Sequence, residues 1–253
     1  MTSPGPRDDS EVPDPFGTLR NALWIGGGQW AGKSTVARLL AVRYGVTVYQ
    51  YDYHDARGHN DRRIARRVAL GEPAAEPDPD TVWVDTTPEQ MAATTLEGFP
   101  ERFQWALDDL RALVSGRPVI AEGWGLRPEL VAPLADSPRR MVVMVPTPEF
   151  RRQQVRELPR AASLGNRVTD PARAQANRLA RDRLVAEDAV RSAHRLGIRV
   201  IEIDGSRDAD TITDLVAEHF SPYLPEAETS AGTSSKASAE VEAEMDVEAG
   251  RST

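Results

Sequence analysis

The chain has 253 residues, of which 40% are hydrophobic and 28% charged, and its formal net charge is -8 at pH 7. No apolar run approaches the roughly 18 residues of a membrane span, and the absence of cysteine excludes disulfides and thiolate metal sites. This composition indicates a globular, cytoplasmic protein with no membrane partner. It leaves the oligomeric state open.

The acidic charge is concentrated at the two ends of the chain. Residues 1–17 hold four acids and one base, and residues 226–253 hold seven acids and two bases. Both segments are poor in apolar residues, so we predict that they are disordered tails. The remaining residues, 18–225, form the predicted folded domain, and their charges balance. We therefore expect no nucleic-acid partner.

A phosphate-binding loop begins the folded domain. After the apolar run Leu23 to Ile25, four residues fall on the G-x-x-x-x-G-K-[ST] spacing, and a helical pattern follows. Glycines let several backbone N–H groups point at one phosphate chain, while the lysine contacts the phosphates and the serine hydroxyl coordinates Mg²⁺. The predicted nucleotide-binding residues are Gly27, Gly28, Gln29, Trp30, Ala31, Gly32, Lys33, Ser34 and Thr35.

Alternating apolar and helical patterns continue after the loop. The first half of the chain predicts a helix over about Lys33–Tyr44, a strand over Val46–Tyr53, a helix over Ala56–Leu70, a loop over Glu72–Asp80, a helix starting at Pro88, and another helix over Glu101–Val114. The second half predicts strands over Pro118–Ala121, Arg140–Val145 and Ile198–Ile203, helices over Pro148–Leu158, Pro171–Arg195 and Ala209–Phe220, and an irregular segment over Pro159–Asp170.

Five short apolar strands that alternate with helices imply a parallel sheet with helices on both faces. Such a sheet binds its ligands at the carboxyl ends of its strands. We therefore expect the residues that follow the five strands to face one cleft. These residues are Gly27–Ser34, Asp52, Glu122, Pro146 and Asp204.

The segment from about Asn21 to Phe220 resembles the P-loop kinases of the nucleoside-monophosphate kinase type, a group that includes shikimate kinase, gluconate kinase and chloramphenicol phosphotransferase. The stretches GGGQWAGKSTVARLLA, VIAEGWGLRPELVAPL and PTPEFRRQQ are similar to uncharacterised actinobacterial ATPase-like proteins. The resemblance implies a three-layer α/β sandwich whose five parallel strands have the order 2-3-1-4-5. It also implies ATP and Mg²⁺ as cofactors, a substrate-binding insert at about 56–115, and an arginine-bearing lid at about 151–170.

Asp52 matches the carboxylate that contacts the acceptor hydroxyl in such kinases. A carboxylate at this position can orient the hydroxyl and accept its proton as the γ-phosphoryl group leaves. Asp55 is the alternative candidate. Asp52 could instead cap a helix or lie in a solvated turn.

Glu122 leaves a buried strand beside the loop, where a charged group needs a partner. It either holds Mg²⁺ through water, contacts substrate, or caps the next segment. Neither the third nor the fourth predicted strand ends in the expected Walker-B aspartate. The predicted metal site therefore consists of Ser34 and Glu122.

Arginines in the lid would stabilise the transferred phosphoryl group. Arg167, in the sequence NRVTD, is the first candidate and Arg156 the second, ahead of Arg151, Arg152 and Arg160. The predicted catalytic set is thus Lys33, Asp52, Glu122, Arg167 and Arg156. Trp83, Trp105 and Trp124 are candidates to line the acceptor pocket, although core packing is the favoured interpretation for Trp105.

These features favour an ATP-dependent (or GTP-dependent) phosphotransferase that acts on a hydroxyl of a small molecule, such as a metabolite or antibiotic-like compound. A nucleotide or nucleoside kinase is one alternative. A regulatory NTPase that binds ATP and has no acceptor is the other.

Overall fold

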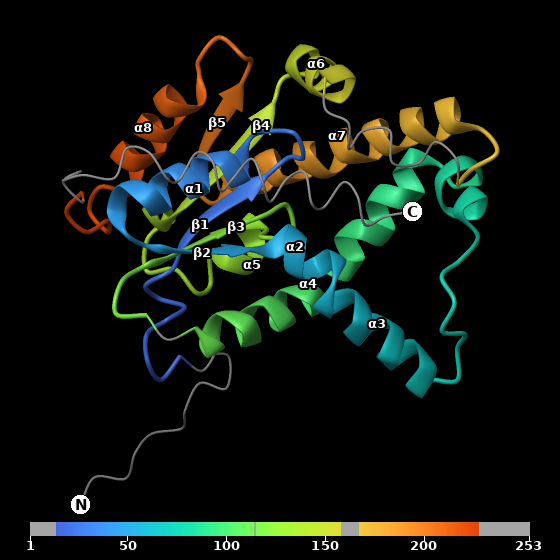
Figure 1. Cartoon of the computed structure of the whole chain (residues 1–253), viewed down its shortest axis with the longest axis horizontal. Helices are drawn as coiled ribbons and strands as arrows, with labels where there is room; N and C mark the ends of the chain where they lie inside the picture. Colours follow the sequence, from blue (N-terminus) through green and yellow to red (C-terminus); the bar gives the residue numbers. More distant parts are fainter. Residues whose placement is uncertain (1–13, 114, 158–166, 228–253) are drawn as a thin grey trace, which may run out of the picture.

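A computed structural model describes residues 14–113, 115–157 and 167–227. Within them, five strands form one parallel sheet in the order β2-β3-β1-β4-β5 (Figure 1). The order confirms the predicted P-loop α/β fold. The strands are β1 (Leu23–Gly27), β2 (Thr47–Gln50), β3 (Val119–Glu122), β4 (Met141–Pro146) and β5 (Arg199–Ile203).

Helices connect the strands and cover the sheet. They are α1 (Lys33–Tyr44), α2 (Tyr51–Ala56), α3 (Gly58–Ala69), α4 (Pro88–Ala112), α5 (Pro128–Val131), α6 (Pro148–Glu157), α7 (Pro171–Arg195) and α8 (Ala209–Phe220), with a short π-helix, η1 (Thr81–Asp85), and a 3₁₀-helix, η2 (Pro138–Arg140). No helix in the described parts of the chain combines the length and apolar character that crossing a bilayer requires.

Alternate residues of the strands pack on opposite faces of the sheet, as the pleat requires. Leu23 and Ile25 of β1 contact one core, which includes residues of α1 and α8. Trp24, between them, contacts a second core, which includes residues of α4 and α7. The central strands β1 and β4 are buried along their whole length and apolar, because helices cover both faces of the sheet.

Strand β2 is shorter than the predicted strand, and Tyr51 begins helix α2. The pairing of β2 with β3 ends at Gln50 and Glu122, because β3 itself ends there and Gly123 turns away with φ 150°. Past Gln50 the backbone has no strand to pair with, so it satisfies its hydrogen bonds within a helix. Asp52 therefore lies in the first turn of α2.

Helix α4 joins the two predicted helices into one of 25 residues that runs through Pro100. Its start at Pro88 is as predicted, and Thr87 and Gln90 form a capping box there. Proline removes one backbone hydrogen bond, but the continuous buried face that includes Phe99, Phe103 and Leu107 outweighs this loss. The predicted tails and the irregular segment Pro159–Asp170 lie largely outside the described residues.

Candidate active site

The phosphate-binding loop leaves β1 along a path that only glycine allows at its first position. Gly27 has φ 114°, and a Cβ there would lie 2.2 Å from the carbonyl oxygen of Met144. The next N–H, that of Gly28, donates to the same oxygen at 2.9 Å. The neighbouring strand β4 thus fixes the start of the loop, and the later turn depends on Gly32 with φ 75°.

Lys33 begins α1 and folds back over the loop. Its side chain is 5% exposed, and its Nζ donates to the carbonyl oxygen of Gly28 at 2.8 Å. In the described part of the chain no side chain caps the N-terminus of α1, so its N–H groups are available to an anion. The loop therefore combines a buried ammonium group, a helix N-terminus and curved backbone in the way that phosphate binding requires.

Asp52 lies beside this loop because α2 follows directly on β2. The backbone N–H of Trp124 donates to Asp52 Oδ1 at 3.0 Å, and the side chain of Gln29, in the loop, lies near the same carboxylate and favours its ionised form. Burial raises the pKa of Asp52 above its usual value, while attraction to Lys33 partly offsets the rise. Asp52 is thus held by the Trp124 N–H and lies close enough to Lys33 to feel its charge.

Glu122, at the end of β3, is 1% exposed, and its neighbours include Lys33, Asp52 and the hydroxyl of Ser34. Burial raises the pKa of Glu122, with Lys33 acting in the opposite direction. Its Oε2 is buried and has no hydrogen-bond partner among the residues that the structure describes. The fold thus brings Lys33, Ser34, Asp52 and Glu122 together from three segments of the chain.

The oxygens of Ser34 and Glu122 suit a magnesium ion better than zinc, which needs three or four protein ligands. Among the residues described, no group of three or more His, Asp or Glu side chains could hold a metal by itself. Mg²⁺ commonly uses one or two protein oxygens and completes its shell with water and phosphate. The unpartnered Glu122 Oε2 next to the Ser34 hydroxyl suits this donor set.

The alternative base, Asp55, has a structural partner. Arg102 of α4 donates to Asp55 Oδ2 at 2.9 Å, and both side chains are largely buried. The other guanidinium nitrogens of Arg102 donate to the backbone carbonyls of Gly98 and Thr95. Asp55 therefore secures α2 to α4, which leaves Asp52 as the carboxylate beside the loop.

The two lid arginines are exposed, and the structure does not place them against the loop. Arg156 lies in the last turn of α6 and makes no hydrogen bond or ion pair with any other described residue. Arg167 lies just before α7, near Thr169, whose N–H donates to Asp80. Arg151 is the buried arginine of α6, and the negative charges near it are those of Asp182 and Glu187. Arg160 lies outside the described residues.

Helix α7 contributes residues that the sequence reasoning missed. Arg181 lies with its guanidinium carbon 5.3 Å from the ring centre of Trp83 and 5.0 Å from that of Trp124. Asp182 accepts a hydrogen bond from the indole of Trp30, and Arg178 lies over the same indole. The i, i+3 spacing of Arg178 and Arg181 on a predicted helix was a usable signal. The abundance of arginine obscured it.

The end of β5 places Gly205 against α6. A Cβ on Gly205, which has φ 83°, would lie 2.7 Å from the ring of Phe150. Asp204 accepts hydrogen bonds from the backbone and hydroxyl of Ser206, which lower its pKa. The chain after β5 thus forms a tight polar turn. At the end of β4, Pro146 pairs with Ile203 of β5.

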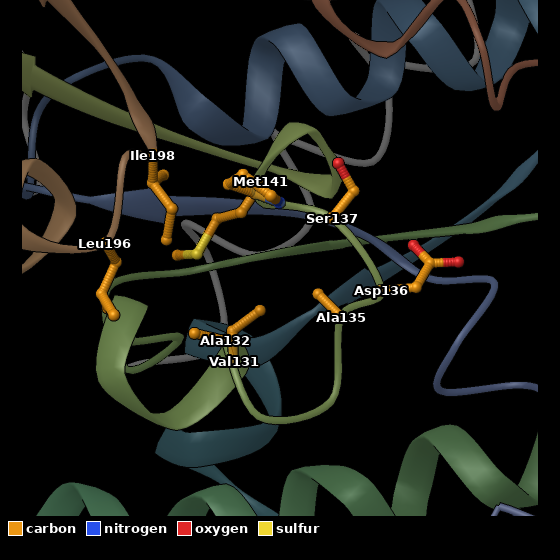
Figure 2. Close-up of a pocket in the computed structure, with 9 residues that line it drawn as sticks. Val131, Ala132, Ala135, Asp136, Ser137, Met141, Leu196 and Ile198 are labelled. Atoms are coloured by element: carbon orange, nitrogen blue, oxygen red, sulfur yellow. The ribbon is translucent and has the colours of Figure 1, made fainter.

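A cavity of about 210 Å³ lies at the opposite edge of the sheet, near the starts of β4 and β5. Figure 2 shows Leu196 and Ile198 on one side of it and Val131 and Ala132 on another, with Met141 between them. The lining is mainly aliphatic. It includes none of the predicted site residues.

No protein-family model matches this chain, and no curated protein matches it either. Among solved structures, the chain is similar to the shikimate kinase of Aquifex aeolicus, with 14% identity and a TM-score of 0.31. The alignment covers 79% of this chain and 95% of that chain. The strand order and the loop geometry, not this distant likeness, carry the fold assignment.

Proposed function

We propose that this protein transfers the γ-phosphoryl group of ATP, or of GTP, to a hydroxyl of a small molecule. One observation carries the proposal: a held carboxylate, Asp52, lies beside the phosphate-binding loop and close to Lys33. A site that only binds nucleotide needs the loop and the lysine. A carboxylate next to them, such as Asp52, supplies the hydrogen-bond and proton acceptor that an acceptor hydroxyl requires.

In the proposed reaction, the loop backbone and the N-terminus of α1 hold the phosphate chain. Lys33 exchanges its bond to the Gly28 carbonyl for contacts with the β- and γ-phosphates, where its charge offsets the charge that develops during transfer. Burial of Lys33 strengthens this effect because little water screens the charge.

Asp52 is the proposed general base. The Trp124 N–H holds its carboxylate, so that it can accept a hydrogen bond from the acceptor hydroxyl and take its proton as the new P–O bond forms. Its raised pKa brings the carboxylate closer to the working pH, which makes it a better proton acceptor than an exposed aspartate.

Ser34 and Glu122 are the residues that would hold Mg²⁺. A bound magnesium ion would neutralise part of the charge on the phosphates. Glu122 lies near Lys33 and the Ser34 hydroxyl, and its Oε2 has no hydrogen-bond partner among the described residues, so this oxygen is available to the ion.

The acceptor lies, in this proposal, against Trp83 and Trp124, which are half-buried and flank Arg181. Within the described residues, the terminal nitrogens of Arg181 make no hydrogen bond, whereas those of Arg102 are satisfied by Asp55 and the Thr95 carbonyl. Arg181 is therefore available to a polar group of the acceptor. Arg167 and Arg156 remain the candidates to reach the phosphoryl group from the lid.

The test is to incubate the protein with γ-labelled ATP, Mg²⁺ and a metabolite extract, and to separate the products. We expect label in a new small compound with the parent protein and none with Lys33→Ala. Label that appears only as inorganic phosphate would favour the regulatory NTPase. Label on a nucleoside or a nucleotide would favour the nucleotide kinase.

A further inference from the structure

Trp30, in the phosphate-binding loop, has an unusual backbone conformation. Its φ of 68° makes it the only non-glycine residue with positive φ in residues 14–113, 115–157 and 167–227. The left-handed region is unfavourable for a residue that carries a Cβ, and bulky side chains are rare there. Contacts elsewhere in the fold must therefore hold Trp30 in this conformation.

Helix α7 supplies those contacts. The indole of Trp30 is 6% exposed, and its Nε1 donates to Asp182 Oδ2 at 3.4 Å, which is long for such a bond. One helical turn further along α7, Ala186 lies 3.1 Å from the position that a Cβ on Gly28 would occupy. Helix α7 thus contacts the loop at two points one turn apart.

Asp182 differs from the other carboxylates of α7 in what it binds. It is 2% exposed, and a buried carboxylate needs partners. Its Oδ1 lies 2.8 Å from Arg181 Nε, but that contact does not have hydrogen-bond geometry. The indole N–H of Trp30 is the one side-chain donor from outside α7 that hydrogen-bonds Asp182 within the described residues.

Asp188, six residues along the same helix, provides the contrast. It accepts a hydrogen bond from Arg127, whose remaining donors bind Glu129 and the carbonyl of Val185. Asp188 thus secures α5 to α7 at a distance from the loop. The two aspartates share a helix, but only Asp182 reaches the phosphate-binding loop.

We propose that Asp182 is a positioning residue for nucleotide binding. Through Trp30 it holds the tip of the loop, Gln29 to Gly32, in the conformation that turns its N–H groups toward the phosphates. Because α7 holds the loop in this order, nucleotide binding does not have to produce it. The proposal rests on the proposed nucleotide site.

The key variants separate the hydrogen bond from the charge. Asp182→Ala removes both, whereas Asp182→Asn keeps an oxygen that accepts from the indole and removes the charge near Arg181. Trp30→Phe keeps an aromatic ring and removes the N–H. If Asp182 acts through Trp30, then Trp30→Phe and Asp182→Ala remove the same interaction.

The experiment measures the Kd of MgATP by calorimetry for the parent, the three variants and the double variant Trp30→Phe/Asp182→Ala. We expect Trp30→Phe and Asp182→Ala each to weaken binding by about ten-fold, the size of one hydrogen bond to a charged group. We expect Asp182→Asn to stay within about three-fold of the parent, and the double variant to bind no more weakly than either single variant.

Asp188→Asn is the matched control, and we expect it to lower the melting temperature without changing the Kd. An Asp182→Asn variant as weak as Asp182→Ala, or losses that multiply in the double variant, would overturn the proposal. If Asp182→Ala does not fold, Trp30→Phe and Asp182→Asn decide alone. If the parent does not bind MgATP, the proposed function fails as well, whereas equal binding by the parent and Trp30→Phe refutes only the role of Asp182.

Discussion

Buried polar groups have different partners at the two edges of the sheet, the edge formed by the carboxyl ends of the strands and the opposite edge formed by their amino ends. At the carboxyl edge, Lys33 and Glu122 are buried, and within residues 14–113, 115–157 and 167–227 one Glu122 oxygen has no partner. At the opposite edge, buried Arg140 pairs with Asp136 at 2.6 Å, and His219 hydrogen-bonds the carbonyl oxygen of Met141 at 2.9 Å. The buried polar groups at the opposite edge are therefore paired within the protein. At the carboxyl edge, an oxygen of Glu122 is left for a ligand to bind.

This contrast separates residues kept for stability from residues kept for chemistry. A buried carboxylate with an unpartnered oxygen, such as Glu122, lowers the stability of the free protein. Its presence is therefore evidence for a role in ligand or metal binding. The cavity at the opposite edge (Figure 2) has a mainly aliphatic lining, which gives no comparable evidence for a functional role. Substitutions at the carboxyl edge should therefore change activity, whereas substitutions at the opposite edge should change stability and leave activity intact.

The largest effect is expected for Lys33→Ala. This change removes the charge that faces the β- and γ-phosphates, so phosphoryl transfer should fall by about 10²- to 10³-fold or more. Nucleotide affinity should also fall, which calorimetry with MgATP would measure. Unchanged activity and affinity would contradict the assignment of the loop as a nucleotide site.

Glu122→Gln should separate stability from activity at a single residue. Because burial raises the pKa of Glu122, its ionised form is unfavourable in the free protein, and the neutral amide should raise the melting temperature. The Mg²⁺ concentration for half-maximal activity should increase by about 10- to 100-fold, as for other changes around metal sites. A lower melting temperature with unchanged magnesium dependence would make Glu122 a structural residue.

His219, at the opposite edge, should affect only the pH dependence of stability. Burial lowers its pKa, with nearby Arg199 and Arg139 contributing, so the folded state holds it neutral. As the pH falls below about 6.5, the unfolded chain binds a proton that the folded state resists, and stability declines by up to about 1.4 kcal/mol per pH unit. In His219→Gln, urea unfolding between pH 7 and pH 5 should show a smaller decline. Equal slopes for both proteins would contradict this account.

The smallest effect on activity is expected for Ala132→Leu, which adds a side chain to the cavity. Ala132 has helical dihedral angles, which leucine adopts readily. Filling a cavity commonly stabilises a protein by about 0.5–2 kcal/mol. We expect a higher melting temperature and unchanged turnover. A loss of turnover greater than a few-fold would show that this cavity is coupled to the candidate active site.

The sequence predicted the parts of the site that depend on local pattern and on strand order. The loop has a residue type for each position, and the rule that ligands bind at carboxyl strand ends placed Asp52 and Glu122 beside it. The end of β2 could not be predicted, because it depends on where β3 stops pairing. Its β-branched and aromatic residues looked like strand as far as Tyr53.

The contribution of α7 was also beyond local pattern. Asp182 contacts Trp30 across 152 residues, and nothing near either residue in the sequence indicates the pairing. Arg181 stands among 29 arginines, so its type carried little information. The arginines chosen for the lid, Arg167 and Arg156, are exposed in the structure, and their roles remain predictions.

The central claim, that Asp52 takes the proton of an acceptor hydroxyl, is tested most directly by Asp52→Asn. The amide keeps the size and polarity of the side chain but cannot accept the proton, so transfer to the identified acceptor should fall by about 10²- to 10⁴-fold. MgATP affinity, measured on the same preparation, should stay within a few-fold of the parent, because Asp52 lies outside the phosphate cradle. Undiminished transfer would remove Asp52 from the mechanism.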